Sequence, residues 1–446
     1  MNICVQFSNP FVLIFIIGSF LSFFINQFLE FIDYKARIKS KGQLPEILQN
    51  IPLAVSSFDN EKLKNICAYE NAKYFSYIPS SICSLIFSLA LVIFGFYPFI
   101  FDLLCIWFGF PATFGNNFLI ILLFLIFTSI PEAIISLPFE LYREFVVEKK
   151  FGFSSMTFKL WLSDQLKSLV LGGILLSLIS LAGSFFLLKF PENWWFILAV
   201  LLISFTFIMQ IIYPKFIAPL FNKFTPLPEG ELKDKITEIL NKTGFSNGGL
   251  FVMDASKRSG HSNAYFSGFG KTKRIVLYDT LIKSMTADEL TAVLGHELGH
   301  FKLKHIIKRL CIMIPLEFVV LFILNKLSHF TRLYTGFGFS SVTPENVNAV
   351  QFIGLFLSVS IFNGISELIS PITNLGSRKD EYQADAYSAE ICETSEHLIT
   401  GLIKLNSENL SELFPPEIYV FWNYSHPTLV ERISALNKIK NKGDEK

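Results

Sequence analysis

The sequence predicts an α-helical integral membrane protein with about seven transmembrane helices and polar segments outside the membrane that carry a zinc-hydrolase motif. Three observations support this fold class. Of the 446 residues, 51% are hydrophobic and only 17% are charged, and Phe alone occurs 50 times. Apolar runs long enough to cross a hydrocarbon layer of about 30 Å recur along the chain. The sequence HELGH lies in a polar segment between two of these runs.

The apolar runs are the candidate transmembrane helices. They lie near residues 10–30, 79–104, 116–137, 167–189, 194–214, 309–326 and 350–371. The first run has no basic segment before it and no small-residue cleavage site, so we expect it to be a retained anchor. The fourth and fifth runs are separated by Phe190–Asn193, which predicts a tight hairpin.

Lys and Arg are distributed unevenly between the two sides of these runs. They concentrate in the segments 31–78, 138–166, 215–308 and 372–446, whereas the N-terminus and the loop at 105–115 contain none. The positive-inside rule therefore places these four segments in the cytosol and the N-terminus outside. We expect a multi-pass protein in contact with membrane lipid, in the endoplasmic reticulum membrane of a eukaryote or the inner membrane of a bacterium. The net charge of +1 gives no reason to expect a nucleic-acid partner.

This arrangement predicts a catalytic domain that is divided in sequence. Residues 1–214 contain the first five transmembrane helices with their cytosolic loops, and residues 309–371 contain the last two. Residues 215–308 and 372–446 are expected to form the first and second parts of the catalytic domain.

The zinc-hydrolase motif is expected to lie on a helix that begins after Thr286, because Thr286 and Glu289 match the capping-box pattern. His296 and His300 are four residues apart, so both imidazoles project from one face of that helix. Two such imidazoles can bind zinc at about 2.0–2.1 Å each. Glu297 can then accept a proton from a water molecule bound to the metal.

A catalytic zinc ion needs a third protein ligand. The candidate follows the seventh apolar run, in the sequence SRKDEYQADAYS, where Glu381 and Asp385 are again four residues apart. We expect Glu381 to coordinate the metal and Asp385 to orient a ligand imidazole through its ring N–H. A solvated acidic helix face explains most ExxxD pairs, and it remains the alternative here.

The polar segment before the motif is expected to contain an amphipathic helix and a short β meander. The helix covers Leu232–Thr243, and the strands cover Leu250–Met253, Asn263–Phe269 and Arg274–Tyr278, with Gly-rich turns between them. A free edge of this meander could bind a peptide in extended form. A meander that only packs on the zinc helix is an equally good interpretation of the pattern.

Three other His residues are candidates for the site. His305 is five residues from His300 and therefore on a different face, so we expect it near the surface or in a supporting role. His261 could contact substrate or form a hydrogen bond within a turn. His426 lies in a rigid Ser-His-Pro turn, from which it could donate to an oxyanion beside the metal.

The apolar runs also contain polar residues, namely Asn26, Gln27, Glu132, Glu317, Asn363 and Glu367. Acids within a membrane usually face a protein interior or a water-filled space. Positions at helix ends would explain several of these residues equally well.

Taken in order, the motifs resemble those of the integral-membrane CAAX prenyl protease type 1 family. The resemblance rests on HELGH with the trailing His305, SRKDEYQADAYS, HSNAYFSGF before RIVLYDTL, APLFNKFTPL at 218–227, and SHPTLVERISAL near the end. It implies seven long helices that enclose an intramembrane chamber, with a gluzincin-like catalytic domain on the cytosolic side. The implied activity is that of a zinc metalloendopeptidase that removes the C-terminal tripeptide of prenylated CAAX proteins or peptides.

The resemblance also implies roles for individual residues. One Zn²⁺ per chain would be held by His296, His300 and Glu381, with Glu297 as the general base. Asp385 would support a ligand, and His426 would stabilise the transition state. The strand that pairs with substrate would be Asn263–Gly268, which includes Asn263, Ala264, Tyr265, Phe266 and Ser267.

Other protein classes remain to be separated from this one. A quality-control membrane protease would share the zinc chemistry but act on unprenylated peptides. An intramembrane-cleaving protease would carry its zinc motif within a transmembrane run, whereas here the motif follows polar strands. A seven-helix transporter or receptor would not need HExxH and ExxxD together.

Overall fold

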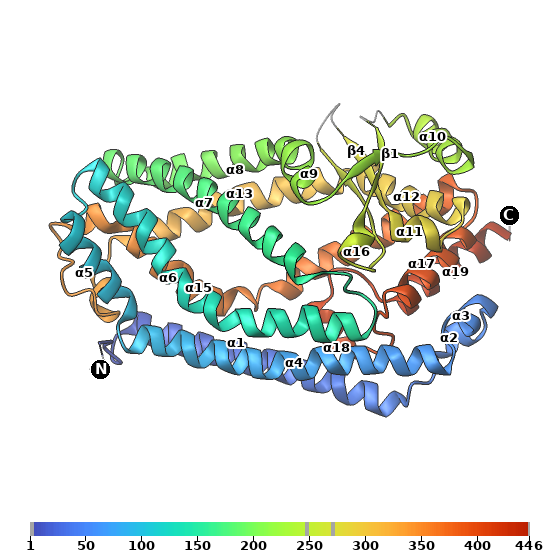
Figure 1. Cartoon of the computed structure of the whole chain (residues 1–446), viewed down its shortest axis with the longest axis horizontal. Coiled ribbons are helices and arrows are strands. Elements are labelled where there is room, and N and C mark those ends of the chain that lie inside the picture. Colours follow the sequence, from blue (N-terminus) through green and yellow to red (C-terminus); the bar gives the residue numbers. More distant parts are fainter. Residues whose placement is uncertain (1–3, 246–248, 269–272, 445–446) are drawn as a thin grey trace.

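The structure is a computed structural model that describes residues 4–245, 249–268 and 273–444. Long helices run side by side along the longest axis of the molecule, and a small sheet with its surrounding helices lies at one end (Figure 1). The N-terminus lies toward the opposite end from the sheet, whereas the C-terminus lies beside the sheet's helices.

Six helical segments in the described part of the chain are long and apolar enough to cross a membrane. They are Pro10–Ser40, Asn60–Ile93, Phe114–Glu148, Phe158–Lys189, Trp194–Phe221 and Val347–Ser366. Their main helices are α1 (Pro10–Ser40), α4 (Asn60–Ile93), α6 (Phe114–Tyr142), α7 (Phe158–Lys189), α8 (Trp194–Ile212) and α15 (Gln351–Ser366). The run predicted at 309–326 forms α13 (His305–Ser328), a 24-residue helix that packs against α8 and α15 but is not among these six segments.

The predicted hairpin at Phe190–Asn193 is confirmed, but two predicted runs have different limits. The run at 79–104 is not one helix, because α4 ends at Ile93 and α5 (Phe96–Phe108) begins after Gly95. Gly95 has φ of 70°, a left-handed conformation that interrupts a helix and that glycine adopts without strain. The last run also ends earlier than predicted, at Ser366, and a turn separates it from α16 (Ser370–Ile391).

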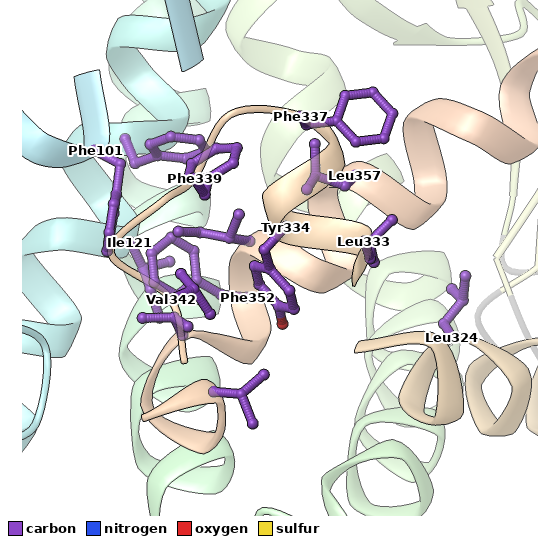
Figure 2. Close-up of a cluster of buried hydrophobic side chains, with 14 of the residues drawn as sticks. Phe101, Ile121, Leu324, Leu333, Tyr334, Phe337, Phe339, Val342, Phe352 and Leu357 are labelled. Atoms are coloured by element: carbon purple, nitrogen blue, oxygen red, sulfur yellow. The ribbon is translucent and has the colours of Figure 1, made fainter. Parts of the chain in front are cut away.

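The end of the bundle farthest from the sheet is closed by a compact apolar cluster. The segment that includes α14 (Thr331–Gly336) places Tyr334, Phe337 and Phe339 among side chains of α5 and α15 (Figure 2). The buried Tyr334 hydroxyl donates to the carbonyl of Ser328 at 2.6 Å. Gly354 is required beside it, since a Cβ there would lie 2.3 Å from the Tyr334 hydroxyl oxygen.

A cavity of about 910 Å³ lies between the long helices, as expected for an enclosed chamber. Glu132, Asn363 and Glu367 line it, as the first interpretation of the polar residues predicts. Asn363 and Glu367 also lie at the C-terminal end of α15, as the second interpretation predicts. Glu367 also accepts hydrogen bonds from Ser22 Oγ at 2.5 Å and Asn26 Nδ2 at 2.6 Å.

Within the residues that the structure describes, the sheet has four strands, and it is not the predicted meander. Its order is β1-β2-β4-β3, with β2 and β4 parallel and the other pairs antiparallel. The strands are β1 (Phe224–Pro226), β2 (Leu250–Met253), β3 (Ala264–Ser267) and β4 (Arg274–Tyr278). β4 takes the central position because Ile275, Val276 and Leu277 are all buried, as in a strand covered on both faces. β3 ends at Ser267, and the predicted strand end at Phe269 lies outside the described residues.

Further helices lie at this end of the molecule, some against the sheet and others against one another or against the membrane segments. The predicted amphipathic helix is confirmed as α10 (Glu231–Thr243). The others are α2 (Glu46–Gln49), α3 (Pro52–Ser57), α11 (Asp279–Ser284), α12 (Ala287–Lys302), α17 (Glu396–Glu408), α18 (Glu417–Asn423) and α19 (Leu429–Asp444). α12 lies between the sheet and α16, which places it at the centre of this end of the molecule (Figure 1).

Candidate metal centre

The helix α12 begins with the predicted capping box. The side chain of Thr286 accepts from the backbone N–H of Glu289 at 3.3 Å, and Glu289 Oε2 accepts from the backbone N–H of Thr286 at 2.8 Å. Leu290, Leu294 and Leu298 are buried in the cluster that includes the sheet. This packing turns the side of α12 that carries the HELGH histidines toward α16.

Two glycines allow α16 to approach α12 closely. A Cβ at Gly299 would lie 2.9 Å from the backbone Cα of Ala384, and one at Gly295 would lie 3.0 Å from Ser388 Oγ. Ser388 Oγ also donates to the carbonyl of Ala292 at 2.6 Å. The glycine within HELGH therefore has a packing role, because it brings Glu381 on α16 within reach of the histidines on α12.

The three predicted ligands come together. The Nε2 atoms of His296 and His300 are 3.1 Å apart, and each lies 3.2 Å from an oxygen of Glu381. A tetrahedral zinc ion with bonds of about 2.0–2.1 Å separates its ligand atoms by roughly 3.3 Å. Glu381 is 4% exposed, and both of its carboxylate oxygens face imidazole nitrogens, as expected of a metal ligand. Two imidazole nitrogens and one carboxylate oxygen thus fit a divalent metal ion.

Asp385 and Arg432 support the first ligand. Asp385 Oδ1 lies 2.7 Å from His296 Nδ1, so the ring can donate to this carboxylate and turn Nε2 toward the other ligands. Arg432 on α19 donates to both oxygens of Asp385, at 2.9 and 2.5 Å. Sequence reasoning missed Arg432, and its place in SHPTLVERISAL, six residues after His426, was the available signal.

His305 supports the second ligand from the first turn of α13. It is 2% exposed, which excludes the surface position. Its Nδ1 lies 3.0 Å from His300 Nδ1, and its Nε2 lies 3.1 Å from Gln383 Oε1. His305 would lie on a different face from His300 if the helix continued through both residues. Lys304 instead adopts a left-handed conformation (φ 57°), which separates α12 from α13 and changes the direction of His305.

The carboxylates and imidazoles of the site have displaced pKa values. Burial alone would raise the pKa of Glu381, but hydrogen bonds with His296 and His300 hold it well below its usual range. Burial alone would lower the pKa of His296, whereas hydrogen bonds with Asp385 and Glu381 raise it to about 9. Burial raises the pKa of the half-buried Glu297, which makes its carboxylate a better proton acceptor. The raised pKa of His296 favours its protonated form beside the Glu381 carboxylate, so a metal ion that binds here must displace that proton. Glu297 lies next to this group and has increased basicity.

His426 lies at the open side of this group. Its side chain is 65% exposed, and Nε2 is 3.5 Å from Glu381 Oε1. His261, by contrast, is enclosed by structural contacts: its ring stacks on Phe153 at 4.0 Å, and its nitrogens lie 3.3 Å from Asn409 Oδ1 and 3.4 Å from Glu148 Oε2. These contacts favour the interpretation of His261 as a hydrogen-bonded turn residue.

The predicted substrate strand lies at one edge of the sheet. β3 pairs with β4 along one side, from Ala264 opposite Leu277 to Ser267 opposite Arg274, and it is last in the strand order. β3 also contacts α12. Asn263 precedes the strand, and its side-chain oxygen accepts from the backbone N–H of Ala264 at 2.8 Å. An extended peptide could add to the outer side of β3 by main-chain hydrogen bonds.

Comparison with known proteins identifies both halves of the chain. The model of "Peptidase family M48" matches residues 226–440, and that of "CAAX prenyl protease N-terminal, five membrane helices" matches residues 36–223. The CAAX prenyl protease 1 homolog of Dictyostelium discoideum is 34% identical over 446 residues, which cover 96% of this chain and 97% of that protein. CAAX prenyl protease 1 of Saccharomyces cerevisiae is 39% identical over 335 residues, which cover 72% of this chain and 73% of that protein.

The solved structures give the same answer. The crystal structure of S. mikatae Ste24p matches with a TM-score of 0.83 and 34% sequence identity, covering 96% of this chain and 99% of that one. The M48 match spans α12 and α16, which carry the His-His-Glu group. The chain therefore belongs to the CAAX prenyl protease 1 family, and it is a multi-pass integral membrane metalloprotease of peptidase family M48.

Proposed function

We propose that this chain is a zinc metalloendopeptidase that removes the C-terminal tripeptide of prenylated CAAX proteins. The observation that carries the proposal is the group formed by His296, His300 and Glu381, whose ligand atoms all lie within 4.8 Å of one another beside an edge strand. The CAAX specificity is inferred from the curated relatives, which are named CAAX prenyl protease 1.

In the proposed mechanism His296, His300 and Glu381 hold one Zn²⁺ ion per chain. Bound zinc supplies Lewis acidity, which polarises the scissile carbonyl and lowers the pKa of water toward about 7. Glu297 accepts the proton of the attacking water and passes it to the leaving amine. His426 donates a hydrogen bond to the oxygen on which negative charge develops. Arg432 and Asp385 keep His296 in the orientation that presents Nε2 to the metal.

The substrate peptide is proposed to bind as an additional strand on β3. Its backbone would pair with Ala264–Ser267, with Asn263 at the start of the strand. Such pairing uses only the peptide backbone, so it holds the scissile bond in an extended conformation beside α12 for substrates with different side chains. The prenyl group would then confer specificity in addition to the backbone contacts.

The catalytic parts, 215–308 and 372–446, are proposed to face the cytosol, where prenylated proteins occur. The support is the concentration of Lys and Arg in the segments on that side of the apolar runs. The host membrane would be that of the endoplasmic reticulum in a eukaryote. Labelling of a cysteine introduced at the exposed Lys379 by a membrane-impermeant reagent tests this, with sealed vesicles of known orientation and a variant lacking native cysteines.

A paired peptide assay tests the activity and the substrate class together. Purified protein in detergent is given a farnesylated CAAX peptide and the same peptide without the lipid, with and without a zinc chelator. We expect release of the tripeptide from the farnesylated peptide, loss of turnover with chelator, and recovery with added zinc. Equal turnover of the unprenylated peptide would instead favour a quality-control protease. Turnover that resists the chelator would contradict the metal mechanism.

A further inference from the structure

The position of His426 depends on its backbone, because its side chain is mostly exposed. Its imidazole is 65% exposed, and Nδ1 lies 2.9 Å from the hydroxyl of the neighbouring Ser425. Close packing of the kind that fixes His296 and Glu381 therefore does not surround this ring. The position of the imidazole must therefore be set by the contacts that hold the backbone turn from Tyr424 to Thr428.

The upstream end of this turn is held by Arg378. Arg378 lies on α16 and is 9% exposed. Its Nη1 donates to the carbonyl of Val420 at 2.9 Å and to the carbonyl of Tyr424 at 2.5 Å. Tyr424 caps the C-terminal end of α18, and its backbone N–H already donates to the Val420 carbonyl at 3.0 Å. The Arg378 guanidinium lies at this end of the helix, where a cationic donor is favoured. Tyr424 is two residues before His426, so a shift of its carbonyl moves the turn directly.

The downstream end is held by the start of α19. Thr428 Oγ1 accepts from the backbone N–H of Glu431 at 3.2 Å, and Glu431 Oε2 accepts from that of Thr428 at 2.7 Å. One residue later, Arg432 donates to Asp385 on α16. The turn that carries His426 is thus tied to α16 at two positions.

These two positions flank the third metal ligand on the same helix. Arg378 and Asp385 are seven residues apart, which is about two turns and roughly 10 Å of an α-helix. Glu381 lies between them. A single rigid helix therefore presents the metal ligand and both points to which the His426 turn is tied.

We propose that Arg378 is a positioning residue for hydrolysis, which acts by holding the Tyr424 carbonyl and so setting the distance from the His426 imidazole to the metal centre. The inference rests on the transition-state role proposed for His426. Displacement of a catalytic group by about 1 Å can cost roughly 100-fold in rate, so loss of this tether should be visible in kcat.

A double-mutant cycle tests the inference. Arg378→Ala, His426→Ala and the double variant are assayed on the farnesylated peptide, together with zinc content and thermal stability. Loss of an oxyanion donor lowers kcat by about 10²–10³-fold, which we expect for His426→Ala. Arg378→Ala should lower kcat by about 10–100-fold with KM changed by less than about threefold. In the His426→Ala background the same change should alter kcat by less than about twofold, because residues that act as a unit are not additive.

Two further variants control for charge and for folding. Lys379→Ala removes the neighbouring exposed cation on α16 and should leave kcat, zinc content and stability unchanged. Arg378→Lys keeps the positive charge near the end of α18 with a single compact donor group, so it should recover part of the lost kcat. If Arg378→Ala does not fold, the same cycle is run with Arg378→Lys.

The outcomes separate this inference from the proposed function. If Arg378→Ala lowers kcat by the same factor with and without His426, Arg378 does not act through His426 and the inference fails. Loss of zinc from Arg378→Ala would also overturn it, because the residue would then act through Glu381. If His426→Ala keeps the native kcat, the transition-state role in the proposed function is wrong, whatever Arg378 does.

Discussion

The two parts of the active site are fixed in different ways. The proposed ligands on α12 and α16 are held by helix packing so close that glycines at 295 and 299 leave almost no space for a Cβ. His426 is instead exposed, and hydrogen bonds to the backbone of Tyr424 and Thr428 hold its turn. The chain leading to that turn is also tied to α1, through Tyr419 with Glu30 at 2.8 Å and Glu412 with Arg37 at 2.6 Å. Metal binding should therefore depend on local helix packing, whereas turnover should also depend on hydrogen bonds and ion pairs formed far from the metal site.

Removal of the third ligand should have the largest effect. In Glu381→Ala two imidazoles remain, and catalytic zinc sites use three protein ligands. We expect loss of zinc and of detectable hydrolysis, measured by metal analysis and the farnesylated-peptide assay. A variant that retained full zinc content would show that another side chain is the third ligand.

Removal of the general base should abolish catalysis while leaving zinc binding intact. Glu297→Gln keeps the shape of the side chain but cannot accept a proton, so zinc content should stay at the native level. A general base contributes about 10²–10⁴-fold, and kcat should fall by that factor. Native turnover in this variant would remove Glu297 from the mechanism.

Weakening the hydrogen bond that supports His296 should lower the affinity for the metal more than it lowers the stability of the fold. Asp385→Asn removes the negative charge of the carboxylate that accepts hydrogen bonds from His296 and Arg432. Changes to such supporting partners typically cost 10–100-fold in metal affinity. We expect a loss of that order in competition with a chelator, with hydrolysis restored by excess zinc. Unchanged affinity would show that packing alone orients His296.

The contrast between the two parts also explains what the sequence could predict. Helical spacing predicts that His296 and His300 share one face and that Glu381 and Asp385 share another, which is a local property that the sequence displays directly. The strand order could not be predicted from local spacing. β4 pairs with β2 in parallel although β3 lies between them in sequence, and β3 takes the position on the other side of β4. Individual apolar runs likewise gave the transmembrane helices but not the interruption at Gly95.

Long-range contacts of ordinary surface residue types were hidden for the same reason. Arg378 and Arg432 belong to motifs that the sequence displayed, yet nothing in their spacing predicts that one holds the Tyr424 carbonyl and the other Asp385. Helical periodicity could not decide between a surface position and a supporting role for His305, because a left-handed residue at Lys304 breaks that periodicity. Such residues become functional candidates only when the fold brings their partners together.

The smallest expected effect concerns the start of α12 and its dependence on pH. Burial would raise the pKa of Glu289, but hydrogen bonds from Lys404 and the backbone of Thr286 hold it below its usual value. A carboxyl group whose pKa is lower in the folded state stabilises the fold above its unfolded pKa, near 4.3, and loses this contribution as pH falls through the folded value. Glu289→Gln keeps a side-chain oxygen that can accept from the Thr286 N–H but loses the ion pair with Lys404, so it should lower the melting temperature at pH 7 by the equivalent of about 1 kcal/mol.

That difference should shrink as the pH falls below about 4, where Glu289 of the native protein becomes protonated as well. The measurement is thermal unfolding of both proteins in detergent between neutral and acid pH, at constant zinc concentration. The exposed Glu390→Gln change, on α16, serves as the control and should show no such pH-dependent difference. Because α12 is held mainly by its packing against α16 and the sheet, zinc content should stay native in Glu289→Gln at pH 7. A loss of zinc there would mean that the ion pair of Glu289 with Lys404, and not only the helix packing, keeps the ligands in place.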